Sequence, residues 1–124
     1  MKKAFLLLEV MLALGVFSVA AVGLLYSLNA AMERAYDCAM VGHVREQTAS
    51  RLAELRLFPL KPGKTVTTDE HGVRYQLNVE PLHLQNCHGV DLANLFRVRM
   101  TVSWNAHGGE WVENNEIYVR QTPK

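Results

Sequence analysis

KKAFLLLEV, residues 2–10, opens an apolar run in which no charged residue occurs from Val10 to Leu28. A helix needs a charge-free run of about this length to cross the hydrocarbon core of a bilayer. One acid, Glu9, stands at the start of the run, where an ionised carboxylate that faces lipid is unfavourable. An ionisable group kept in such a place predicts a function, so the interpretation of the whole chain depends on what Glu9 does.

Three interpretations of the run differ in the role they give to Glu9. A secretory signal peptide would be cut at a small-residue site such as Ser18-Val19-Ala20, but the apolar run continues beyond Ala20 and the acid would serve no purpose. A plain membrane anchor also leaves Glu9 unexplained. In the third interpretation a cut between Ala4 and Phe5 creates a free amine at the helix start. Glu9, one helical turn from Phe5 on the same face, would neutralise that amine or the amine of a neighbouring subunit.

The same residues carry a family resemblance. Lys2-Lys3-Ala4 followed by FLLLEVMLAL, residues 5–14, resembles the class III signal of type IV pilins and type II secretion pseudopilins. The resemblance implies that residues 1–4 are a leader, which a prepilin peptidase removes between Ala4 and Phe5. It also implies N-methylation of Phe5 and a role in assembly for Glu9, the fifth residue after the cut. The residue before the cut is usually Gly in the family and is Ala4 here.

Composition limits what the rest of the chain can be. The 124 residues make one domain at most, and the part after the run, roughly residues 29–124, can bury only a modest core. A net charge of +1 argues against a dedicated nucleic-acid binder, so no nucleic-acid partner is expected. Lys2 and Lys3 precede the run, whereas its far end meets a balanced set of charges. The positive-inside rule therefore predicts a single-pass membrane protein with a cytoplasmic N-terminus and an outward-facing C-terminal domain. In a Gram-negative cell that domain would be periplasmic, and the resemblance implies insertion in the inner membrane.

The two cysteines, Cys38 and Cys87, lie in the part predicted to face outward, where a disulfide can persist. A single pair of cysteines does not by itself indicate a disulfide-stabilised fold. A Cys38–Cys87 bridge and two buried free thiols are therefore alternative predictions.

The apolar run continues into a segment that also favours helix. No proline or turn cluster interrupts the sequence before Leu57, and Pro59 with Pro62-Gly63 ends the helical pattern. We expect one continuous helix with a transmembrane part at residues 5–28 and a periplasmic part at residues 29–58. Its outer half has one apolar face, predicted to be buried: Val41, Val44, Thr48, Leu52 and Leu55. Small residues recur lower down at Gly15, Gly23, Ser27 and Ala31; they would suit packing against other copies, or are simply common in membrane helices.

After Gly63 the apolar period changes from helical to two. Strands are predicted at residues 64–68, 73–79, 96–104 and 111–120, with a turn at residues 69–72 and an irregular segment at residues 81–94. One face of these strands is predicted to be inward: Val73, Tyr75, Leu77, Val79, Phe96, Val98, Met100, Val102 and Trp104. The fold class is therefore α+β, with residues 59–124 forming a small antiparallel sheet against the upper half of the helix.

A second resemblance narrows the placement within the family. QTASRLAELRL, residues 47–57, resembles the helix end of I-type minor pseudopilins, and V-type minor pilins share part of it. The helix-kinking proline of many major pilins would fall near Tyr26 and is absent, as is a C-terminal cysteine pair. The resemblance implies a minor pseudopilin of a type II secretion system, a structural subunit that initiates or caps a periplasmic pseudopilus driving protein export. The alternative is a V-type minor pilin of a type IV pilus, acting in assembly, adhesion or DNA uptake.

The partners that the resemblance implies are other minor and major pseudopilins, the prepilin peptidase, an inner-membrane assembly platform and the lipid bilayer. No catalytic motif or phosphate-binding loop occurs in the sequence, so the chain is not expected to be an enzyme and no cofactor is assigned. His83, Cys87 and His88 could supply three zinc ligands, but a loop cysteine that bridges or packs is the preferred interpretation, and no metal site is assigned. Asp69 and Glu70 could bind a cation; as adjacent acids in a turn they are expected to face water.

Overall fold

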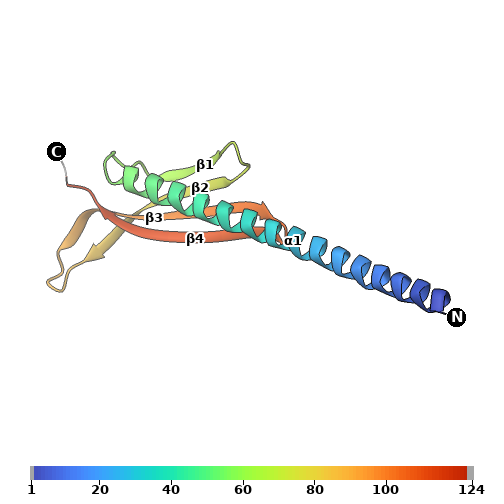
Figure 1. Cartoon of the computed structure of the whole chain (residues 1–124). Helices are drawn as coiled ribbons and strands as arrows, with labels where there is room; N and C mark the ends of the chain where they lie inside the picture. Colours follow the sequence, from blue (N-terminus) through green and yellow to red (C-terminus); the bar gives the residue numbers. More distant parts are fainter. Residues whose placement is uncertain (1, 123–124) are drawn as a thin grey trace. The chain divides into compact units, whose positions relative to one another are not determined.

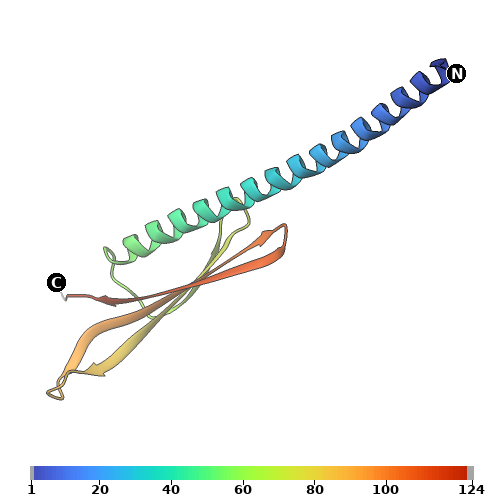
Figure 2. The ribbon, with the colours of Figure 1, turned by 60° about the horizontal axis from the view of Figure 1, so that its bottom comes forward.

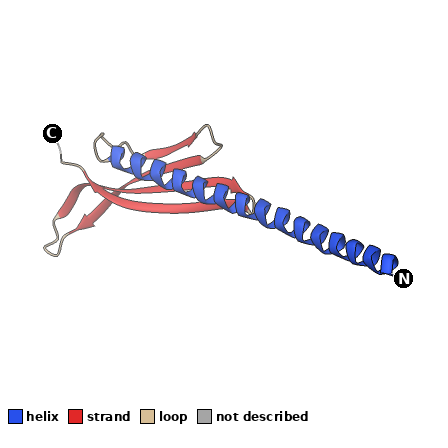
Figure 3. Ribbon diagram, viewed as in Figure 1, coloured by secondary structure: helices blue, strands red, loops and turns tan. Residues whose placement is uncertain are grey.

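A computed structural model describes residues 2–122 of the chain. A single helix, α1, spans Lys2–Leu55 and is followed by four strands: β1 (Gly63–Thr68), β2 (Arg74–Gln85), β3 (Asp91–Ala106) and β4 (Gly109–Arg120) (Figures 1 and 3). The predicted continuous helix, the four strands and the α+β class are confirmed. A long N-terminal apolar helix followed by an antiparallel sheet is the layout of a pilin-like chain.

The chain divides into two compact units, Met1–Ala39 and Met40–Lys124. In the first unit the described residues, 2–39, are all helical. The second unit contains the last part of α1 and the whole sheet. The sheet is an antiparallel meander with the strand order β1-β2-β3-β4, in which each strand pairs with the next along the chain. Figure 2 shows the strong twist of this sheet.

The core of the second unit lies between the sheet and the last turns of α1. Val44 and Thr48 are buried on the helix, and Val73, Tyr75, Met100, Val102 and Trp104 are buried on the sheet side. A second group, around Val79, Val98 and Val119, continues the core toward the end of the helix, where Leu52 and Leu55 pack against it. The predicted inward faces of helix and strands are therefore confirmed. The buried hydroxyl of Thr48 donates to the carbonyl oxygen of Val44 at 2.7 Å.

The helix ends slightly before the predicted point. After Leu55 the amide groups of Arg56 and Leu57 bond three residues back, to Ala53 and Glu54, and the chain then leaves the helix. The segment after the helix is held by the side chain of Gln121, which directly follows β4. The Gln121 amide donates to the carbonyl oxygen of Phe58 at 2.7 Å and accepts from the backbone of Leu60 at 3.1 Å.

The prediction of an irregular segment at residues 81–94 was wrong. β2 continues to Gln85 and β3 begins at Asp91, so the two strands form a long hairpin whose tip is residues 86–90. The irregularity is confined to one register shift between Leu82 and Leu84, opposite Asn94, which adopts a φ of 60°. Asn tolerates this left-handed conformation better than most residues, and the bulge lets pairing continue on both sides.

The hairpin tip repeats a turn that occurs earlier in the chain. DEHGV (residues 69–73) joins β1 to β2, and NCHGV (residues 86–90) joins β2 to β3. In each turn the first side chain accepts two backbone N–H bonds, from the third and fifth residues of the turn, at 2.8–3.0 Å. Gly72 and Gly89 have φ of 77° and 75°, which glycine adopts without the steric cost of a Cβ. Both turns follow from an Asx residue three positions before a glycine.

Candidate functional site

The apolar segment at residues 5–28 is a continuous helical surface that no other part of the described chain covers. Every residue in it is exposed except Ala21, which is partly buried, and Phe5 is 70% exposed. The helix is long and apolar enough to cross a membrane. The hydroxyl of Ser18, the first in the run, donates to the carbonyl oxygen of Leu14 at 2.7 Å, so its donor is satisfied without a water molecule. A fully exposed apolar surface of this size is unfavourable in water and favourable in lipid.

Glu9 lies at the N-terminal end of this surface. It is exposed, and among residues 2–122 it has neither a hydrogen-bond partner nor an ion-pair partner. Ala4 and Phe5 belong to the first turns of α1, and Phe5 and Glu9 lie one turn apart on one helix face. The described chain therefore presents a carboxylate beside exposed apolar side chains without a group to neutralise it. Cleavage between Ala4 and Phe5 and methylation of Phe5 remain predictions.

The glycines of the apolar segment have no packing role among the described residues. A Cβ added at Gly15 or at Gly23 would meet no atom within 4 Å. Gly in a helix interior costs about 1 kcal/mol relative to Ala, so these positions reduce helix stability without improving any contact in the described chain.

Both cysteines are free and exposed. Cys38 lies on α1 and Cys87 at the tip of the β2–β3 hairpin. The alternative of two buried thiols is therefore wrong, whereas a Cys38–Cys87 bridge in the oxidised protein stays a prediction. His83, Cys87 and His88 do not converge to form a three-ligand group in the described residues.

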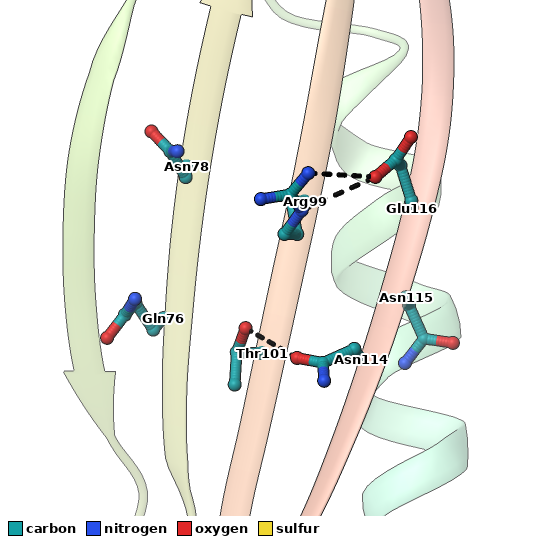
Figure 4. Close-up of a pocket in the computed structure, with 7 residues that line it drawn as sticks. All are labelled: Gln76, Asn78, Arg99, Thr101, Asn114, Asn115 and Glu116. Carbon is teal, nitrogen blue, oxygen red and sulfur yellow. Dashed lines mark hydrogen bonds and ion pairs between the residues drawn. The ribbon is translucent and has the colours of Figure 1, made fainter.

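The sheet face that points away from α1 is polar and contains a shallow hollow of about 490 Å³. Figure 4 shows Gln76 and Asn78 on β2, Arg99 and Thr101 on β3, and Asn114, Asn115 and Glu116 on β4 around this hollow. Arg99 pairs with Glu116 at 3.2 Å, and Thr101 donates to Asn114 at 2.8 Å. The groups on this face largely satisfy one another.

The charges on this face are also paired. The Tyr118 hydroxyl donates to Glu116 at 2.6 Å and is the largest cause of the lowered pKa of Glu116, with the Arg99 and Arg97 charges acting in the same direction. The same contact raises the pKa of Tyr118. Arg97 lies 3.6 Å from Glu80 and 3.8 Å from Glu116. With two arginines facing two glutamates, this region offers little net field to a charged ligand.

One side-chain cluster was not predicted from the sequence. His43, on α1, meets Asp69 and His71, in the β1–β2 turn, and one ligand atom from each of the three lies within 4.8 Å of the others. His43 Nε2 is 3.6 Å from Asp69 Oδ2, and the two imidazole ring centres are 4.7 Å apart. The expectation that Asp69 faces water was wrong, because its side chain is only 16% exposed; Glu70 is exposed as expected.

The turn geometry determines the charge state of Asp69. Partial burial raises the pKa of its carboxyl group, but N–H donation from Val73 and His71, with smaller effects of the two imidazoles, outweighs burial and lowers the pKa below its usual value. Asp69 is therefore ionised at neutral pH. Burial and then the Asp69 charge raise the pKa of Tyr75, so the phenol nearby stays protonated.

Comparisons of the chain with protein-family models, with curated proteins and with solved structures find no match. The assignment of function therefore depends on the sequence motifs and on the geometry described above.

Proposed function

We propose that this chain is a minor pseudopilin of a type II secretion system, a subunit that initiates or caps a periplasmic pseudopilus. The observation that carries the proposal is the uncovered apolar helix at residues 5–28 with an unpartnered carboxylate, Glu9, at its start. A lipid bilayer would cover the apolar side chains before assembly. Neighbouring helices of the same kind would cover them in the filament.

In this proposal Glu9 finds its partner after processing. Removal of residues 1–4 creates an amine on Phe5, one helical turn from Glu9, and methylation of that amine keeps it basic. In a filament the carboxylate of one subunit pairs with the amine of its own chain or of an adjacent one. Removing one partner of a buried pair leaves a charge without compensation, so an axial slip between subunits is strongly disfavoured. The pair therefore sets the register of one helix on the next.

The glycines of the segment support packing against other helices. Gly15 and Gly23 have open space at the Cβ position within their own chain, and small residues let helices approach closely in a membrane. The polar sheet face and the compact second unit supply a domain that the helix carries. The proposed orientation, with the N-terminus cytoplasmic and residues 29–124 periplasmic, follows from Lys2 and Lys3 before the run.

A deletion strain tests this proposal and separates it from the alternative. Without the chain, exported proteins should accumulate in the periplasm, and expression of the wild-type chain should restore their release to the medium. The measurement is the ratio of extracellular to periplasmic substrate, with surface pili counted in the same cells. Loss of pili with normal export would contradict the pseudopilin proposal and favour a V-type minor pilin. Normal export together with normal pili would contradict both functions.

A further inference from the structure

The cluster of His43, Asp69 and His71 has the composition of a transition-metal site. All three residues belong to the second unit, and each offers one ligand atom within 4.8 Å of the other two. Two imidazoles and one carboxylate are ligands that Zn²⁺ accepts, whereas Ca²⁺ and Mg²⁺ prefer oxygen ligands. The cluster is independent of the membrane segment, so it does not depend on the proposed function.

The β1–β2 turn leaves one carboxylate oxygen available. Asp69 Oδ1 accepts the backbone N–H groups of His71 at 2.8 Å and Val73 at 3.0 Å. Asp69 Oδ2 is buried and has no hydrogen-bond partner among the described residues. An ionised oxygen in this position is unfavourable unless a cation or a donor compensates it. His43 Nε2, at 3.6 Å, lies just beyond hydrogen-bonding distance.

The spacing of the ligand atoms fits zinc. Tetrahedral ligands at about 2.1 Å from Zn²⁺ lie about 3.4 Å from one another. The distance between His43 Nε2 and Asp69 Oδ2, 3.6 Å, is already close to this value. The ligand atom of His71 lies within 4.8 Å of the other two, and because the His71 ring is exposed, a small rotation can bring it closer. Three protein ligands leave a fourth position open to water. The Tyr75 hydroxyl is buried and has no hydrogen-bond partner in the described chain.

The β2–β3 turn provides an internal comparison. It has the same backbone hydrogen bonds, with Asn86 in the position of Asp69 and His88 in the position of His71. In residues 2–122 no histidine from the helix completes a three-ligand group at this second turn. The turn conformation by itself therefore requires neither the carboxylate nor His43. These are the two groups that distinguish the first turn.

We propose that His43, Asp69 and His71 bind one Zn²⁺ per chain. The bound ion links the last part of α1 to the β1–β2 turn. It neutralises Asp69 Oδ2, which has no donor in the described chain. Binding to the folded state alone would also stabilise the second unit in proportion to the logarithm of free metal concentration.

The test uses the full-length protein in detergent, stripped with a chelator and titrated with Zn²⁺ alone. The variants are His43→Ala, Asp69→Asn and His71→Ala, and His88→Ala is the matched control in the second turn. Asp69→Asn keeps the turn acceptor, as Asn86 does in the second turn, but removes the anionic ligand. We expect one Zn²⁺ per wild-type chain and a loss of affinity of at least about tenfold in each of the three variants. Zn²⁺ should raise the melting temperature of the wild type and of His88→Ala.

X-ray absorption at the zinc edge gives an independent result, because two imidazole ligands should be visible in the wild type and one in His71→Ala. The proposal is overturned if the wild type binds no stoichiometric Zn²⁺. It is also overturned if binding survives all three substitutions, or if His88→Ala abolishes it.

Discussion

Glu9→Ala should leave the precursor in the membrane and open to cleavage, yet nearly abolish its recovery in the assembled filament. The apolar run and the leader residues are unchanged, so insertion and processing should continue. In the filament the amine of Phe5 would lose its partner, and leaving one charge of a buried pair uncompensated costs about 3–5 kcal/mol. The measurement is the fraction of processed chain that co-purifies with sheared filaments.

Two further variants show whether charge is the cause. Glu9→Gln keeps the size and hydrogen-bonding capacity of the side chain but removes its charge, so it should fail in the same way. Glu33→Ala removes an exposed acid on the same helix beyond the apolar run, where its contact with Asn29 is long, 3.5 Å, and should have no effect. Normal recruitment of Glu9→Gln would contradict the role of Glu9 in setting register.

Trp104→Ala should be the most destabilising single truncation in the sheet. Trp104 is 5% exposed and belongs to the core beneath α1, so its removal leaves a cavity as well as losing apolar contact. Such truncations cost about 3–5 kcal/mol of unfolding free energy. Trp111, its cross-strand partner, stacks on it with a ring separation of 6.3 Å but is 55% exposed. Trp111→Ala should therefore cost only about 1 kcal/mol.

Urea unfolding of the full-length protein in detergent provides the measurement. The sequence has two tryptophans, so each variant keeps one indole as a fluorescence reporter of the second unit. Equal losses for the two variants, or a larger loss for Trp111→Ala, would contradict the placement of the core between α1 and the sheet.

Much of the fold could be predicted because its determinants are periodic. The helical spacing of Val44 and Thr48 and the alternation of Val98, Met100 and Val102 depend on backbone geometry alone. The hairpin tip was missed because Asn86 and Gly89 were not recognised as a repeat of Asp69 and Gly72. The turn chemistry was readable from the sequence; the bulge opposite Asn94 was not, because it depends on the pairing of two strands.

The Glu9 segment and the His43–Asp69–His71 cluster also differ in whether the sequence could predict them. The segment around Glu9 was visible in the sequence because its signal is local: a leader, an apolar run and one acid within a few turns. Asp69 and His71 lie in one turn, but His43 is far from them in the sequence, on α1, and the three follow no metal-binding spacing. Only the packing of α1 on the sheet brings them together, so their convergence depends on the tertiary structure.

The most direct test of the proposed function is the intact mass and N-terminal residue of the protein extracted from membranes. The proposal predicts a chain that has lost residues 1–4 and begins with N-methylated Phe5. A chain that begins near Ala21 would identify an ordinary signal peptide, and a chain that retains residues 1–4 would leave only a membrane anchor. Either result would contradict the assignment of this protein to a pilin-like assembly.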